Sequence, residues 1–161
     1  MKNSSPIKRH QALISFSKDH HFGLLLVWKI RRGLSMNIEP ERMSKYAVFF
    51  FQNDLAHHFK LEEQTLFSKL PPDDLLRRQA YQEHENIGSL VDRLQKDRSN
   101  PGIVGEFAEA LESHIRFEER VLFNHLQTTL SDEQLIKGLE EHGKHECNVD
   151  DKWSDHFWTG K

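Results

Sequence analysis

One pattern of histidine and glutamate occurs twice in this chain and could bind metal. Residues 58–67 read HFKLEEQTLF and residues 114–123 read HIRFEERVLF, so both copies have the form His-x-x-x-Glu-Glu-x-x-Leu-Phe. On a helix, side chains four residues apart lie one above the other on the same face. Each copy could therefore bind one ion, through His58 and Glu62 or through His114 and Glu118. Two such helices facing each other could bind two ions, with each carboxylate free to bridge them.

A single His-x-x-x-Glu pair would carry little weight in a chain with 11 histidines among 161 residues. His142 and Glu146 form a third such pair, which we interpret as a coincidence. Chance would rarely produce the extended match between residues 58–67 and 114–123. The alternative interpretation is a pair of amphipathic helices whose Leu and Phe are buried and whose His and Glu are solvated.

Length and composition restrict the class of protein. With 37% hydrophobic and 29% charged residues, we expect one globular domain over residues 1–161. The net charge of −3 gives no electrostatic reason to expect nucleic acid or an anionic membrane as a partner. The single cysteine, Cys147, excludes a disulfide framework and a cysteine-rich zinc site. We find no signal peptide and no apolar run long enough to span a bilayer, so we expect a cytoplasmic protein.

The apolar residues recur with helical spacing along the chain, which predicts an all-α fold. Prolines and capping residues divide it into four long helices at about residues 12–34, 40–69, 73–98 and 101–130. Ser131 and Gln134 form a capping box for a shorter helix that ends near Gly143.

Short loops between long helices predict an up-down-up-down four-helix bundle with a short extra C-terminal helix. The bundle core is expected at about residues 12–130, with the C-terminal helix and an aromatic tail at 131–161. Bundles of this kind build metal sites from inward side chains on facing helices.

The first and third helices each carry a histidine at a height that suits the same site. His84 is the candidate on the third helix, and His20 or His21 is the candidate on the first. At about 1.5 Å per residue, these positions fall within roughly one turn of His58 and His114. His20 continues the apolar stripe of its helix better, whereas His21 has an apolar residue three positions later, as the other candidates do. We prefer His21 and keep both.

These ligands favour a pair of iron ions. Nitrogen and carboxylate donors without thiolate suit iron, manganese or zinc, and bridging carboxylates in a helical bundle favour a redox-active pair. Di-iron bundles of the ferritin type use Glu-x-x-His motifs. The chain contains no Glu-x-x-His, which argues against that class.

Taken together, these motifs resemble the hemerythrin-like HHE cation-binding domain family. The resemblance covers about residues 12–130, and the form His-Phe-x-x-Glu-Glu at 58–63 is specific to that family. It implies an oxo- or hydroxo-bridged pair of non-haem iron ions. Glu62 and Glu118 would bridge the two ions, and the histidines would be terminal ligands.

The chain departs from the oxygen-carrying hemerythrins on its third helix. Those proteins have a second histidine one turn from the first, where this chain has Ala80 and Gly88 on either side of His84. The resemblance then implies an additional open position at the metal. This fits less well with reversible oxygen carriage than with the wider bacterial HHE proteins, which resemble sensors or handlers of oxygen, iron or nitric oxide.

Three functions compete. We favour a di-iron protein that binds or senses oxygen, another diatomic such as nitric oxide, or iron. The second is an enzyme with the same centre that oxidises Fe(II) or responds to nitric oxide or peroxide. The third is a helical interaction module with a single zinc. The oligomeric state is left open.

Several neighbouring residues receive simpler interpretations. Glu63 and Glu119 are expected to orient a ligand or to lie in solvent. His142 and the other remaining histidines are expected at the surface. In the metal-free protein, Glu62 and Glu118 would face each other, so we expect at least one of them to take up a proton.

Overall fold

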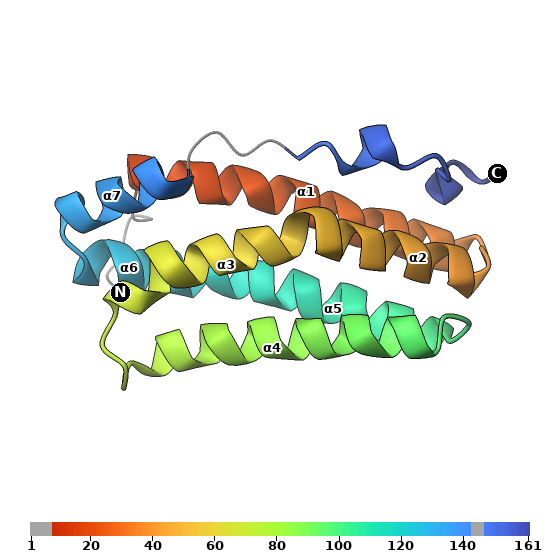
Figure 1. Cartoon of the computed structure of the whole chain (residues 1–161), viewed down its shortest axis with the longest axis horizontal. Helices are drawn as coiled ribbons and strands as arrows, with labels where there is room; N and C mark the ends of the chain where they lie inside the picture. The colour runs from red at the N-terminus through yellow and green to blue at the C-terminus, as the bar shows by residue number, and fades with distance from the viewer. Residues whose placement is uncertain (1–7, 143–146) are drawn as a thin grey trace, which may run out of the picture.

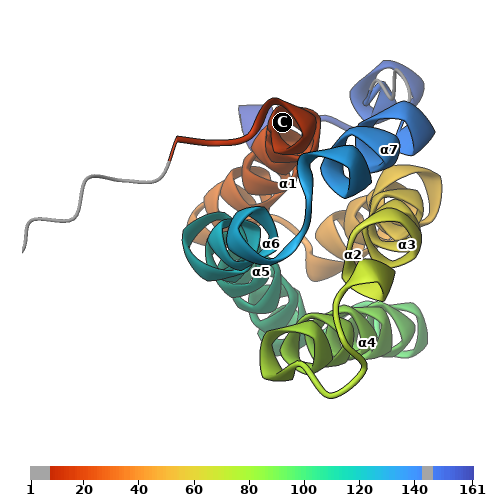
Figure 2. The same ribbon diagram turned by 90° about the vertical axis from the view of Figure 1, so that its left-hand side faces the viewer.

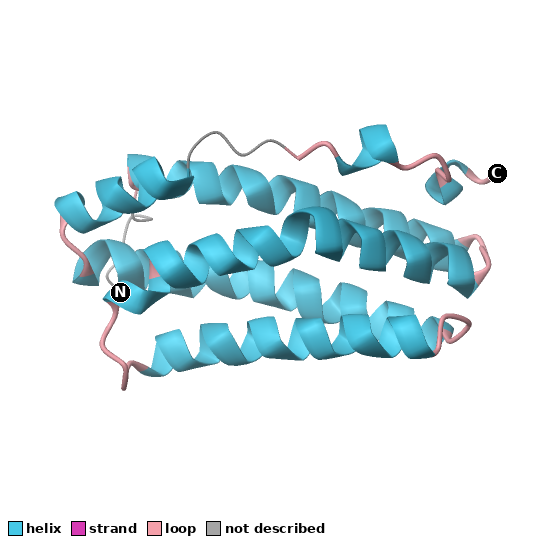
Figure 3. Cartoon of the chain, viewed as in Figure 1, coloured by secondary structure: helices cyan, strands magenta, loops and turns pink. Residues whose placement is uncertain are grey.

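The computed structural model describes residues 8–142 and 147–161, and its regular elements are all helical (Figure 3). The prediction of an all-α fold is therefore confirmed for this part of the chain. The long elements, in chain order, are α1 (Gln11–Ser35), α2 (Pro40–Phe50), α3 (Ala56–Thr65), α4 (Leu75–Lys96), α5 (Pro101–Phe117), α6 (Phe123–Thr129) and α7 (Asp132–His142). Shorter π-helical turns are η1 (Phe51–Leu55) and η3 (Glu118–Leu122), and 3-10 turns are η2 (Phe67–Lys69), η4 (Val149–Lys152) and η5 (Phe157–Thr159).

Side-chain caps fix where two of these helices begin. The side chain of Asn100 accepts a hydrogen bond from the N–H of Gly102 at 2.9 Å, at the start of α5. Ser131 and Gln134 form the reciprocal bonds of a capping box before α7. The expected end of that last helix, Gly143, lies outside the described residues.

In the described part of the chain, the helices form four long rods, which are α1, α2–α3 joined by η1, α4, and α5–α6 joined by η3. The two π-helical turns lie inside the second and the fourth rod. In η1 the N–H of Ala56 bonds to the carbonyl of Phe51, and in η3 the N–H of Phe123 bonds to the carbonyl of Glu118. Each of these bonds spans five residues instead of four, so each turn inserts one extra residue and shifts the helical face that follows. Such turns occur frequently at functional sites. Here η3 begins at Glu118 itself, and η1 ends shortly before His58.

The rods lie side by side (Figures 1 and 2). In Figure 1, α1 and α4 run from the end marked by α6 and α7 toward the opposite end, while α2–α3 and α5–α6 return. Helix α5 packs against both α1 and α4, and α7 lies across α1 and α3. No described helix combines the length and apolar character needed to cross a bilayer.

The aromatic tail covers the end of the molecule formed by α1 and α2. The ring of Tyr46 lies 5.7 Å from that of Trp153, 5.7 Å from that of Phe157 and 5.1 Å from that of Trp158, measured between centroids. Arg42 holds the segment by hydrogen bonds to the carboxylate of Asp155. The tail therefore belongs to the packed structure.

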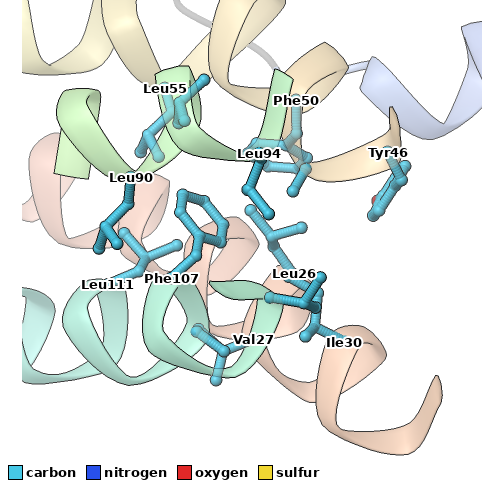
Figure 4. Packing of buried hydrophobic residues seen from close by; sticks show 14 of the residues in the cluster. Leu26, Val27, Ile30, Tyr46, Phe50, Leu55, Leu90, Leu94, Phe107 and Leu111 are labelled. Atoms are coloured by element: carbon cyan, nitrogen blue, oxygen red, sulfur yellow. The ribbon is translucent and has the colours of Figure 1, made fainter. Parts of the chain in front are cut away.

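Buried apolar side chains form two clusters. The larger includes Leu26, Tyr46 and Phe107 (Figure 4), and the second includes Phe16 and Phe123. Along α1, a buried polar residue falls between Phe16 of one cluster and Leu26 of the other, and the other rods repeat this order. The clusters thus enclose a polar layer, and buried polar groups are costly unless they are bonded or bind a ligand.

Candidate metal centre

Six side chains from four rods converge in this polar layer. Each is at most 6% exposed. They fall into two groups whose ligand atoms lie within 4.8 Å of one another: His20, His58, Glu62 and Glu118; and Glu62, His84, His114 and Glu118. Each group has two histidines, and the two glutamates belong to both groups. The structure thus brings together six of the seven residues that the sequence singled out.

In the first group, His20 lies between the two shared carboxylates. Its Nε2 is 2.8 Å from Oε2 of Glu118 and 3.8 Å from Oε2 of Glu62. The Nε2 of His58 is 3.2 Å from Oε1 of Glu62, one turn away on α3. The imidazole and carboxylate of one helix therefore face the same space, as the four-residue spacing predicts.

The second group repeats this arrangement. The Nε2 of His114 is 2.6 Å from Oε1 of Glu118, one turn later. The Nε2 of His84 is 3.4 Å from Oε1 of Glu62 and 3.4 Å from Oε1 of Glu118. Both glutamates are fully buried. Glu118 turns Oε2 toward His20 and Oε1 toward the second group. Glu62 turns Oε1 toward both His58 and His84, and Oε2 toward His20.

Every histidine of the cluster turns its other nitrogen, Nδ1, to an outer carboxylate. The contacts join His20 to Glu119 at 2.7 Å, His58 to Asp19 at 3.1 Å, His84 to Glu63 at 2.7 Å and His114 to Glu83 at 2.8 Å. Each outer carboxylate is next in sequence to a cluster residue on the neighbouring rod, so the contacts form a closed ring around the four rods. An Nδ1–H donated to a carboxylate fixes the tautomer and leaves Nε2 for a metal ion.

The donor set fits metal ions, because four of its buried atoms face other members of the cluster but have no partner in hydrogen-bond geometry. They are Nε2 of His58, Nε2 of His114, and both carboxylate oxygens of Glu62. Buried polar atoms are nearly always bonded, so an orphaned set calls for an explanation. Here the orphans are imidazole nitrogens and carboxylate oxygens that face one another, which is a ligand set suited to iron, manganese or zinc.

Without a metal ion, protons on the histidines replace the missing positive charge. Burial alone would lower the pKa of His58, but Glu62 and Asp19 raise it to about 9. Burial would also lower the pKa of His20 and of His84, but hydrogen bonds to Glu118 raise both values well above the ordinary range. The pKa of His114 is raised as well.

The expectation that a glutamate takes up a proton is therefore corrected. Burial would raise the pKa of Glu118, but the neighbouring His114 and the other hydrogen bonds bring it well below its usual value. The pKa of Glu62 is also lowered, with His58 countering burial and the repulsion from Glu118. In the metal-free site the protons thus belong to the imidazoles, because four histidines surround two carboxylates.

His20, and not His21, lies in the cluster, so the geometry favours His20 over the His21 that we preferred. His21 is exposed and its ring lies 5.4 Å from that of Phe22. The residue three positions after His20 is Gly23, where an added Cβ would lie 2.8 Å from Cδ1 of Ile115. Helix α1 approaches α5 so closely here that glycine replaces the apolar residue found after the other histidines.

His142 is buried, although the sequence placed it at the surface. It is 7% exposed, its Nε2 lies 2.8 Å from Oδ2 of Asp19, and its ring lies 4.6 Å from that of Phe16. Asp19 thus accepts from both His142 and His58. The contact depends on how α7 packs across α1, which no local pattern in the sequence encodes. Glu146, its partner in the third His-x-x-x-Glu pair, lies outside the described residues.

Comparisons with known proteins agree with this geometry. The family model described as the hemerythrin HHE cation binding domain matches residues 13–126, which include all six clustered side chains. No curated protein matches the chain, and no solved structure does.

Proposed function

Because the chain belongs to the hemerythrin HHE cation binding domain family, we propose that its six clustered side chains hold two iron ions. His20 and His58 would be the terminal ligands of one ion, and His84 and His114 those of the other. Glu62 and Glu118 would bridge the two ions. The observation that carries this proposal is the set of orphaned, inward-facing nitrogen and oxygen atoms shared between two four-residue groups.

We propose that the framework is the up-down-up-down four-helix bundle expected from the sequence, built from α1, α2–α3, α4 and α5–α6. The alternating courses of these rods support it (Figure 1). The π-helical turns would be adjustments within two of the rods, and α7 with the aromatic tail would be additions to the bundle.

A bound iron pair supplies a redox-active Lewis acid that can bind a small diatomic ligand. The chain would supply four protein ligands per ion, which would leave coordination positions for such a ligand. The ring of outer carboxylates would keep each Nε2 directed at the bound ions, and the two apolar clusters would limit access of water. We therefore propose a protein that binds or senses oxygen, nitric oxide or iron.

A redox enzyme with the same centre is the second candidate. The same coordination positions favour it, because oxidation of Fe(II) or reaction with peroxide also needs a position next to a protein-bound ion. The presence of two complete donor groups argues against a module with a single zinc.

Metal analysis tests the proposal directly. Protein purified from an iron-supplemented culture should contain about two iron ions per chain and show charge-transfer absorbance in the near ultraviolet. A single zinc, or no metal, would contradict it. Stopped-flow spectra with oxygen then separate the two candidates, since binding gives reversible bands and turnover gives irreversible loss of them.

A further inference from the structure

The cluster consists of two halves with matching parts. His20 preceded by Asp19 corresponds to His84 preceded by Glu83, and the two His-x-x-x-Glu-Glu copies correspond to each other. The contacts correspond as well, because Asp19 contacts His58 of the first copy and Glu83 contacts His114 of the second copy. Differences between the halves therefore show what each half is suited to do.

The half with His20 and His58 is covered by elements outside the repeat. Arg9 donates to the carbonyl of Glu119 at 2.6 Å and lies over the ring of Phe123, 5.2 Å from its centroid. That ring stacks on His20. Asp19, the outer carboxylate of His58, is covered by His142 of α7.

The other half borders an open groove between α3 and α4. The groove has a volume of about 400 Å³, and His84 forms part of its wall. The remaining lining residues are Phe51, Ala56, Phe59, Lys60, Glu63, Tyr81 and Glu85. Glu63 and its counterpart Glu119 are equally exposed, at 31%, so His84 and His20 differ in what lies over the imidazole ring rather than in their own outer carboxylates.

Phe59 forms part of the groove wall and packs against the metal ligands of this half. Its ring stacks on His84 with centroids 3.8 Å apart and planes 8° from parallel. It also lies 5.5 Å from the ring of His114 and 6.2 Å from that of Phe51. The corresponding residue in the second repeat is Ile115, so the aromatic plate occurs only in the first of the two copies.

The surroundings of His84 on α4 leave room beside the groove. Ala80, one turn before it, offers no donor atom. One turn after it, a Cβ added at Gly88 would only reach ordinary contact, 4.0 Å from Cζ of Phe51. The groove wall combines aromatic rings with one lysine and two glutamates, so it favours a small uncharged ligand over an anion.

We propose that small uncharged ligands of the oxygen or nitric oxide class reach the centre through this α3–α4 groove. They bind at the ion held by His84 and His114, and the ring of Phe59 is the gate. This inference rests on the proposed function, because it assigns the access route and the reactive ion of the same site.

The groove can be filled without touching a ligand. Ala56→Trp places an indole in the groove, and Lys137→Trp places one in a separate open cleft on α7 as the matched control. With Fe(II)-loaded protein and nitric oxide in a stopped-flow spectrometer, Ala56→Trp should slow association on the order of 10-fold and leave the final spectrum unchanged. Lys137→Trp should associate at the wild-type rate. Equal rates in all three proteins would overturn the access route.

A second measurement uses the metal-free protein. Phe59→Leu keeps an apolar side chain but removes the stacked plate, so deuterium exchange at the C2 position of His84 should speed up several-fold while that of His20 stays unchanged. Equal acceleration at both histidines, or none at His84, would overturn the gate. If the chain binds no iron, the proposed function fails, whereas this exchange result still decides whether Phe59 shields His84.

Discussion

The two halves of the cluster have the same donors but different surroundings. Each half has two histidines, shares two glutamates and orients its imidazoles with outer carboxylates. Asp19, behind His58, is only 8% exposed, whereas Glu83, behind His114, is 28% exposed. The donors correspond because the sequence repeats. The residues that cover the two halves differ, because Arg9 and α7 cover only the half with His20 and His58 and are not part of the repeat. In the proposed di-iron centre, a symmetric ligand set would thus give one enclosed ion and one accessible ion.

This comparison predicts which changes affect both halves and which affect one. The largest effect is expected from a shared residue. Glu118→Ala removes oxygens that lie near His20, His84 and His114, so both ions should be lost together. Affinity for iron should fall on the order of 100-fold or more, since changes beyond the ligands already cost 10–100-fold. Iron content after dialysis is the measurement.

The isosteric variant Glu118→Gln is the control for packing. It keeps the volume of the side chain but removes its charge, so it should fold with a helical content like that of the wild type and still bind iron poorly. If Glu118→Ala retained one ion at full affinity, this glutamate would not be shared between the halves.

The next effect should be confined to one half. His20→Ala should release the enclosed ion, and His84→Ala the accessible one, each with a loss of affinity on the order of 10–100-fold or more. His21→Ala changes only an exposed side chain and is the matched control. Titration with Fe(II) under anaerobic conditions would show one site lost in each ligand variant and two sites in the control. Loss of a site in His21→Ala, with none in His20→Ala, would reverse our assignment on α1.

A smaller effect is expected from the outer carboxylates. Asp19→Asn and Glu83→Gln each weaken the orientation of one histidine, by on the order of 10-fold in metal affinity. Asp19→Asn should be the more harmful of the two, because the side chain of Asp19 is less exposed than that of Glu83 and also accepts from His142. The ratio of the two losses, measured by competition with a chelator, tests the difference between the halves. Equal losses would mean that burial behind His58 does not matter to binding.

The sequence predicted those parts of the site that depend on local geometry. His58 with Glu62, and His114 with Glu118, follow from the four-residue spacing of a helix turn. His84 follows from its height along a rod. The choice between His20 and His21 could not be made locally, because it depends on the close approach of α1 to α5 at Gly23.

The fold was predictable to a similar extent. The caps at Asn100 and Ser131 are local signals, and the structure contains them. The π-helical turn that begins at Glu118 left no signal that spacing alone could detect. Glu63 and Glu119 were expected to orient ligands or lie in solvent, but which histidine each one contacts depends on how the rods pack against each other.

The smallest predicted effect is on the pH dependence of the melting temperature. It concerns both halves, because protons and metal ions compete for the same histidines. The folded pKa of His58 is about 9, against an ordinary value of 6.5. A histidine whose pKa is raised in the folded protein adds stability that is fully present at a pH below its ordinary pKa. This stability is lost as the pH rises through the pKa of the folded protein. The melting temperature of the metal-free protein should therefore fall as the pH rises from about 7 to 9.5, by on the order of 5 °C. His20, His84 and His114, whose pKa values are also raised, should act in the same direction.

Iron should reverse this dependence. Metal binds the neutral imidazoles, so protons compete with it less as the pH rises, and binding to the folded state adds stability by mass action. The difference in melting temperature between iron-loaded and metal-free protein should then widen from pH 7 to 9.5, as measured by calorimetry at matched ionic strength. His58→Gln should make the curve of the metal-free protein less steep, while His21→Ala should leave it unchanged. A difference that narrows over this range would mean that the histidines of the metal-free cluster are already neutral at pH 7.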